Sequence, residues 1–135
     1  MMKKLKIAFI LLAVSCNGKP GRTPTLDKAH EVHLEAVGLY DQAHQLYDSL
    51  KKEAKEKGDA LLIGRLDSIH DLMHDWEKGL YEIPGYEHSH HDHGHDHKHE
   101  HKTPPKMTDE SMLDYQKNAR DAISEIKEGL GKLLE

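Results

Sequence analysis

The sequence predicts an all-α fold: an up-down-up three-helix bundle with a long, disordered, His-rich loop between its second and third helices. Apolar residues recur at spacings of three and four in three segments, the pattern of helices that bury one face. Capping residues, prolines and glycines mark the ends of these segments. No segment alternates apolar and polar residues for long enough to predict a strand. The chain of 135 residues is long enough for one small domain.

The first helix is expected to begin at Thr23-Pro24, because the threonine hydroxyl can cap the helix and proline suits its first position. A lysine-rich turn followed by Gly58 marks its end. Gly38 lies inside it, where glycine costs about 1 kcal/mol relative to alanine, and is expected to mark a kink or a close helix contact. The apolar face is wide, as in a bundle rather than a coiled coil. Its residues are Leu26, Ala29, His33, Ala36, Tyr40, Ala43, Tyr47, Leu50 and Ala54.

The second helix is expected to begin after Asp59, whose carboxylate is a good cap, and to stop at Ile83-Pro84-Gly85. Its apolar face comprises Leu62, Leu66, Ile69, Met73, Trp76 and Leu80. Residues 25–83 therefore form a helical hairpin, which we expect to be the firmest part of the bundle.

The third helix, within residues 108–135, completes the bundle. Thr108 is expected to cap it, and Asp109 and Glu110 in its first turn interact favourably with the helix dipole. Its apolar face comprises Met112, Gln116, Ala119, Ile123, Ile126, Leu130 and Leu133. A bundle of this kind is compatible with many functions, so the function must be sought in particular residues.

Residues 1–15 have the layout of a secretory signal peptide: three lysines, then an apolar run too short to span a membrane. The end of this segment with Cys16 resembles a bacterial lipobox, in which the chain is cut before the cysteine and the cysteine is lipidated. The usual leucine three places before the cysteine is Ala13 here. Residues 16–24 would then be the lipidated cysteine and a short tether. The sequence thus predicts a lipid-anchored protein of the cell envelope, on its periplasmic or outer-membrane face.

Removal of this leader takes away three lysines and changes the net charge from −5 to −8. An acidic protein does not suit nucleic acid, whose phosphates require a basic face, but it attracts cations. Cys16 is the only cysteine. Its lipidation would leave no thiol, so disulfides and thiolate metal sites are excluded, and any metal ligands must be nitrogen or oxygen atoms.

Residues 84–107 form the predicted loop, which has prolines at both ends and is longer than compact domains normally allow without a function or disorder. Its segment 88–101 reads HSHHDHGHDHKHEH, and eight of these fourteen residues are histidine. We call this segment the His tract. Repulsion between protonated histidines favours disorder of the tract without metal. The candidate ligands are His88, His90, His91, His93, His95, His97, His99 and His101.

Imidazole is the commonest metal ligand in proteins, and it suits Zn, Cu and Ni rather than Mg or Ca. Alternate residues of an extended chain lie about 7 Å apart, whereas residues four apart become neighbours in a helical turn. Many ligand sets are therefore possible, and the tract predicts interchangeable sites of broad selectivity rather than one rigid catalytic site. Zn²⁺ is the expected ion, with Cu²⁺ and Ni²⁺ as alternatives, and no cofactor is required.

A second candidate metal site lies on the predicted helices. His70 and His74 are four residues apart on one helix face. Folding of the hairpin at Gly58 places His44 level with residues 72–73, so the three imidazoles could bind one ion. The alternative is that these histidines lie at the edge of the core and form hydrogen bonds with carboxylates.

Two further histidines, His30 and His33, fall level with residues 83–86 in the same hairpin. That level is the root of the predicted loop, so both could add ligands to metal held by the His tract. Here too the alternative is an ordinary histidine at the boundary of the core. Neither helical group matches an established metal-binding signature.

A resemblance to known proteins rests on LMHDWEKGL (72–80) and KMTDESMLDYQKNARDAISEIKEGL (106–130). These segments resemble small helical bacterial lipoproteins often labelled "viral A-type inclusion protein", a label that does not describe an activity. The likeness covers the second and third helices and, more loosely, the first. It implies an envelope-anchored helical protein of unknown function, and it provides no catalytic or binding residues to transfer. In such proteins a shorter loop takes the place of the His tract.

Three functions are compatible with these observations. The first is a lipoprotein that binds divalent metal ions for buffering, sequestration or transfer. The second is a structural or interaction protein in which a helical face binds a partner and the tract is incidental. The third is a pH sensor, because thirteen histidines gain charge together on acidification. The sequence favours the first. An enzyme is not expected, because no nucleophile–base pair, phosphate-binding loop or acid pair stands out.

Overall fold

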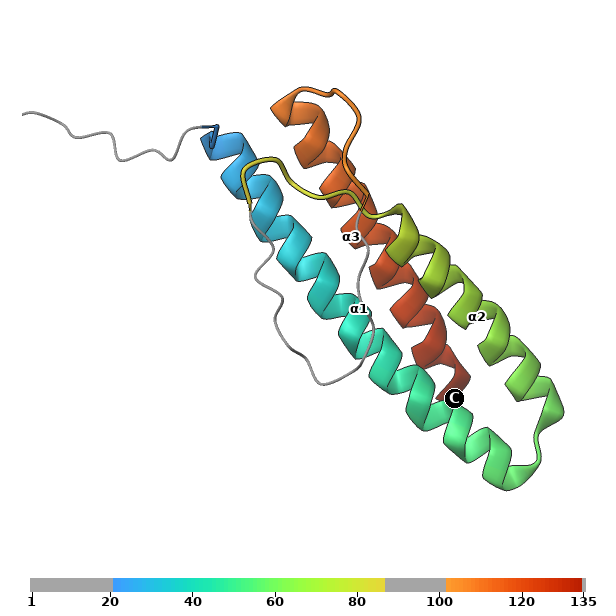
Figure 1. Cartoon of the computed structure of the whole chain (residues 1–135). Helices are drawn as coiled ribbons and strands as arrows, with labels where there is room; N and C mark the ends of the chain where they lie inside the picture. The colour runs from blue at the N-terminus through green and yellow to red at the C-terminus, as the bar shows by residue number, and fades with distance from the viewer. Residues whose placement is uncertain (1–20, 87–101, 135) are drawn as a thin grey trace, which may run out of the picture.

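The computed structural model describes residues 21–86 and 102–134, and within these ranges the protein is helical and has no strand. Helix α1 spans Pro24–Lys57, α2 spans Ala60–Gly79, α3 spans Asp109–Gly131, and a short 3₁₀ helix, η1, spans Lys132–Leu134. The chain runs along α1, back along α2 and forward again along α3, so α1 and α3 are parallel (Figure 1). The predicted all-α fold with three helices is confirmed. The predicted leader, Cys16 and the His tract lie outside the described residues.

Both ends of α1 are those that the sequence predicts. The Thr23 hydroxyl accepts a hydrogen bond from the Leu26 amide at 3.2 Å, and Pro24 takes the first helical position. Gly58 follows the helix in the left-handed conformation, with φ of 65°, and its amide donates to carbonyls of the last turn. A larger residue would be strained at this φ, so glycine lets the chain turn directly into α2.

The starts of α2 and α3 also match the prediction, but the end of α2 does not. Asp59 and Thr108 cap the two helices, each accepting a hydrogen bond from the amide three residues on, at 2.9 and 3.2 Å. Helix α2 ends at Gly79, before the predicted stop at residues 83–85. Leu80 is already extended, with φ of −68° and ψ of 127°, and its carbonyl accepts a hydrogen bond from the Lys102 amide rather than from a further helical turn.

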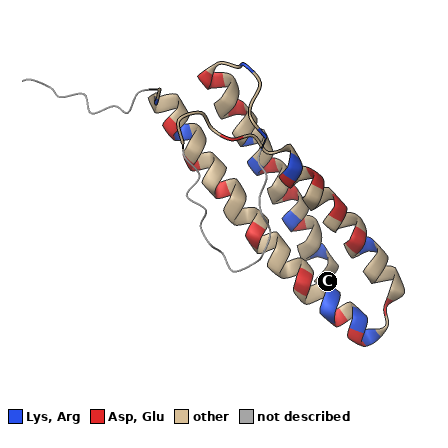
Figure 2. Cartoon of the chain, viewed as in Figure 1, with Lys and Arg blue, Asp and Glu red and all other residues tan. Residues whose placement is uncertain are grey.

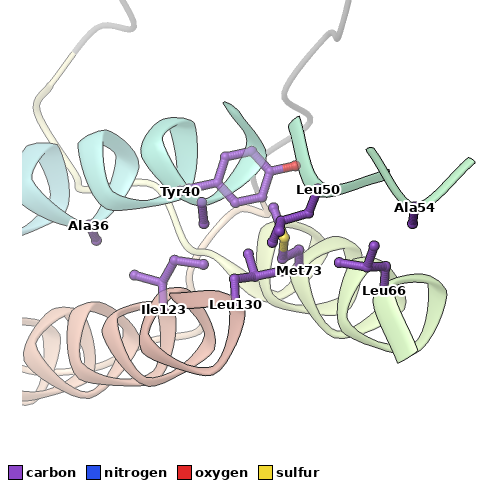
Figure 3. Close-up of a cluster of buried hydrophobic side chains, with 9 residues drawn as sticks. Ala36, Tyr40, Leu50, Ala54, Leu66, Met73, Ile123 and Leu130 are labelled. Atoms are coloured by element: carbon purple, nitrogen blue, oxygen red, sulfur yellow. The ribbon is translucent and has the colours of Figure 1, made fainter. Parts of the chain in front are cut away.

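The main core lies between the three helices, where buried side chains from all of them meet (Figure 3). The side chains that α1 contributes include small ones, which let helix axes approach closely. The most extensive packing is between α1 and α3, which run side by side (Figure 1). The α1–α2 hairpin is therefore not the most extensively packed pair of helices, and the expectation that it is the firmest part of the bundle stays a prediction. The buried core residues are Ala36, Tyr40, Ala43, Leu50, Ala54, Leu66, Met73, Ile123 and Leu130.

A second, smaller core closes the end of the bundle where α1 begins. Its buried members are Leu26 and Ala29 of α1, Ile83 of the segment after α2, and Met112 of α3, none more than 4% exposed. Residues 80–86 cross this end of the bundle, and the burial of Ile83 fixes them there. The small core therefore holds the chain immediately before the His tract.

The described surface is largely polar. Residues with charged side chains recur along the length of all three helices (Figure 2). The large apolar side chains that remain exposed in the described ranges are Leu34 on α1, Leu61 and Leu72 on α2, and Leu134 on η1. No described helix is long and apolar enough to cross a membrane.

Candidate functional site

The structure describes the chain on both sides of the His tract and shows how the two sides meet. Tyr81 and Lys102 form an isolated parallel bridge. The Lys102 amide donates to the Leu80 carbonyl at 3.1 Å, and the Glu82 amide donates to the Lys102 carbonyl at 3.0 Å. We call this pairing the loop base. In the sequence, all eight tract histidines lie between these two segments, which pair with each other on the bundle.

A buried polar network joins the loop base to the helices. Gln116 of α3 is fully buried, and its side-chain nitrogen donates to the Tyr81 carbonyl at 3.0 Å. Its side-chain oxygen lies 3.2 Å from Nδ1 of His33 on α1, which is 6% exposed. Because an amide oxygen only accepts hydrogen bonds, His33 carries a hydrogen on Nδ1. The network thus connects α1, α3 and the loop base.

The spacing of apolar residues places Gln116 on the buried face of the third helix but does not reveal its hydrogen bonds. The one available signal was a pair of polar residues, Gln116 and His33, at core positions of two different helices. Their contact depends on how α1 and α3 align, which the pattern of each helix alone does not determine.

Tyr86 is the last described residue before the tract, and two groups pack on its ring. The His30 imidazole stacks on it with ring centres 3.8 Å apart, and the Arg22 guanidinium lies 3.8 Å from the same ring centre. The Tyr86 hydroxyl donates to Asp27, and burial together with this carboxylate raises the pKa of Tyr86. His30 therefore lies at the root of the loop, as the sequence predicted. Whether His30 and His33 share metal with the tract stays a prediction.

His44 and His70 meet in the seam between α1 and α2. Their ring centres are 5.8 Å apart, with an angle of 73° between the planes. The carboxylate of Asp48 lies 3.4 Å from Nδ1 of His44, and the ring of Tyr47 stacks on His70 at 4.6 Å. The sequence placed His44 level with residues 72–73, and in the structure its ring lies beside His70, within one helical turn of that level. Both the histidine pair and a carboxylate partner are present.

His74, the third residue of the predicted helical site, has a different neighbour. Its Nδ1 lies 3.8 Å from a carboxylate oxygen of Glu77, and the same oxygen accepts a hydrogen bond from the Tyr40 hydroxyl at 3.0 Å. Burial raises the pKa of Tyr40, and the charge of Glu77 adds to the effect, so this hydroxyl remains a donor. Among the described residues, no three His, Cys, Asp or Glu donors converge on a possible ion position. The three-histidine site stays a prediction.

A pocket that the sequence did not predict lies at the end of the bundle where α1 begins. Its volume is about 480 Å³, and residues 82–86 and 103–109 line it together with Leu26 and Met112. The two segments are the chain on either side of the tract. No local pattern could mark this pocket, because the segments come together only in the folded protein.

Known proteins give no guide to the function of this site, so its function is inferred from the chemistry of its residues. No protein-family model matches the chain, and no curated protein or solved structure is similar enough to count as a relative. The notable chemical feature is therefore the abundance of histidines. Two of them meet in the seam of α1 and α2, and eight more lie in the sequence of the His tract.

Proposed function

We propose that this protein is a non-catalytic lipoprotein of the cell envelope that binds divalent transition metal ions through its His tract, for buffering, sequestration or transfer. The observation that carries the proposal is the sequence of residues 88–101, with eight histidines among fourteen residues. Imidazoles at this density provide many overlapping sets of nitrogen ligands. Zn²⁺ is the first candidate ion. Cu²⁺ has the higher intrinsic affinity for such ligands, so the supply of each ion decides between them, and Ni²⁺ is a further candidate.

The loop base supports this proposal. The hydrogen bonds of Lys102 with Leu80 and Glu82 hold the two ends of the ligand-bearing loop together. A loop with joined ends has less conformational freedom to lose when its side chains gather around an ion. The bundle would then serve as a stable support for several adaptable metal sites.

The location in the envelope rests on the N-terminal sequence. A basic and apolar leader precedes Cys16, and a short polar tether separates the cysteine from α1, which begins at Pro24. The resemblance of residues 72–80 and 106–130 to small bacterial lipoproteins agrees with lipid anchorage. A protein anchored in this way would meet metal ions as they enter or leave the envelope.

Titration calorimetry tests the proposed function. The soluble chain starting at Asn17 is titrated with Zn²⁺, Cu²⁺ and Ni²⁺ and compared with a variant in which all eight tract histidines are asparagine. This variant keeps the length of the loop and the loop base at Lys102, so a difference reports on the ligands alone. A second variant, which lacks residues 88–101, checks that loop length does not matter.

We expect the unaltered chain to bind two or more ions with micromolar affinity or better, and the asparagine variant to lose the ions that the tract holds. If the unaltered chain binds no ion more tightly than about 0.1 mM, worth roughly 5.5 kcal/mol, metal handling is not its function. Equal binding by the unaltered chain and the asparagine variant would place the metal elsewhere.

The alternative is a structural or interaction protein that binds a partner through a helical face. Leu61 and Leu72 on α2 are 77% and 56% exposed and lie on the same side of the helix. Arg65 and Ser68 lie between them on this side, and both are exposed. The described face therefore offers two separate leucines rather than the continuous apolar patch typical of a docking surface.

A further inference from the structure

We propose that the seam between α1 and α2 contains a second transition-metal site, separate from the His tract, with His44 and His70 as its first two ligands and His74 as its third. The site lies on two helices and does not depend on the tract. It would bind the same class of ion, Zn²⁺, Cu²⁺ or Ni²⁺, because its ligands are imidazoles.

The spacing of the first two imidazoles fits a shared ion. Zn–N bonds are about 2.0–2.1 Å long, so two imidazoles on one tetrahedral ion have ring centres roughly 5 Å apart. The observed separation between His44 and His70 is 5.8 Å. A small rotation of either ring closes the difference. The two residues come from different helices, so an ion held between them would join α1 to α2.

The carboxylate of Asp48 is positioned to orient His44. It lies 3.4 Å from Nδ1 of that ring, one helical turn further along α1. Histidines that bind metals commonly give their other ring hydrogen to a carboxylate, which fixes the ring and strengthens the ligand. With its hydrogen on Nδ1, His44 presents the lone pair of Nε2 to the ion.

Aromatic rings hold the other side of the seam. Tyr47 stacks on His70 with an angle of 22° between the ring planes. Tyr40 stacks on Trp76 at 5.4 Å, and its ring centre lies 6.0 Å from that of His44. These contacts limit the rotation of the two imidazoles, and a site with little side-chain freedom loses less entropy on binding.

His74 supplies the third ligand by a rotation of its side chain. It lies one turn beyond His70 on α2, so both imidazoles can reach the same ion. Its side chain is 54% exposed and has room to move, and its Nδ1 is now 3.8 Å from Glu77. The described residues contain no converged group of three donors, so this rotation is a required step of the proposal.

The test uses the chain in which all eight tract histidines are asparagine, so that the tract provides no ligands. Calorimetric titration with Zn²⁺ and Cu²⁺ is repeated after His44→Gln, His70→Gln or His74→Gln. His30→Gln is the matched control, because His30 is also a half-buried histidine of α1 but lies outside the seam. Thermal unfolding without added metal shows whether each variant remains folded.

We expect one ion per chain, with affinity reduced at least tenfold by His44→Gln or His70→Gln, less by His74→Gln, and not by His30→Gln. Addition of the ion should also shift the ¹⁵N resonances of the His44 and His70 rings. The proposal is overturned if the asparagine variant binds no ion more tightly than about 1 mM, or if His44→Gln and His70→Gln leave binding unchanged. Because the tract ligands are absent throughout, this result is independent of the proposed function of the tract.

Discussion

At the scale of single residues, Gln116 is the polar side chain on which the loop base most depends. It is fully buried, accepts from His33 and donates to the Tyr81 carbonyl. Its side-chain nitrogen also lies 3.6 Å from the sulfur of Met112, a weak acceptor. One residue thus satisfies groups on another helix and in the segment that leads to the His tract.

Replacement of this glutamine therefore has a predictable cost. Gln116→Leu keeps a side chain of similar size but deprives the buried His33 ring and the partly buried Tyr81 carbonyl of this partner. We expect a loss of about 1–3 kcal/mol in the free energy of unfolding, measured by urea denaturation. Asn118→Ala, at an exposed position of the same helix, is the control and should change stability by less than about 0.5 kcal/mol. Equal effects of the two substitutions would contradict the role assigned to Gln116.

The residue patterns predicted correctly which side chains face the core. They did not predict which side chains contact each other. Of the nine positions predicted for the first helix, Tyr47 alone is only partly buried, because it lies in the seam and stacks on His70. The pairing of His33 with Gln116 and of His30 with Tyr86 depends on the alignment of separate segments. Spacing along one helix does not show how that helix aligns with another. The exception is a pair of helices joined by a very short connection, such as α1 and α2 at Gly58.

At the scale of elements, Gly38 inside α1 and Gly58 directly after it have opposite roles. Gly38 has a helical backbone, and a Cβ atom there would meet nothing within 4 Å, so it marks no close helix contact. Gly58 has a positive φ and no bulky residue can replace it without strain.

These roles predict opposite effects on stability. Gly38→Ala should stabilise the protein by about 0.5–1 kcal/mol, because alanine is the better helix former and no neighbour is displaced. Gly58→Ala should destabilise it by a similar amount, about 1 kcal/mol, through the strained φ. Thermal unfolding of both variants beside the unaltered chain measures the two effects. A destabilising Gly38→Ala would show that this helix position is not open.

The start of each helix was predictable because a single capping residue determines it. Thr23, Asp59 and Thr108 cap their helices through a side-chain oxygen, and that chemistry is visible in the sequence. The end of α2 was placed too late because Leu80 is already extended, so its carbonyl does not join the helical hydrogen bonds. That carbonyl then pairs with Lys102, a partner that no local pattern identifies.

At the scale of the whole molecule, the helical bundle holds one pair of imidazoles and the two segments that flank the His tract. The α1–α3 packing and the small core around Ile83 fix the segment before the His tract, and Lys102 joins it to the segment after the tract. The seam of α1 and α2 separately holds His44 beside His70. The order of the helices and the His tract could be predicted from the sequence, whereas the loop base and the pocket beside it required the folded chain.

The proposed function requires that imidazole nitrogens of the His tract bind the metal. Carboxylates are the competing ligands, because the chain contains 24 acidic residues. The two ligand types differ in pKa: histidine gains a proton near pH 6.5, whereas Asp and Glu remain charged down to about pH 4. Acidification from pH 7.5 to 5.5 therefore removes imidazole ligands and leaves carboxylate ligands in place.

The most direct measurement is a zinc titration of the unaltered chain at pH 7.5 and pH 5.5. We predict that the affinity falls at least tenfold at the lower pH and recovers fully when the pH is raised again. Zinc bound with equal strength at both values would show that carboxylates hold the ion, and the proposed role of the His tract would be wrong.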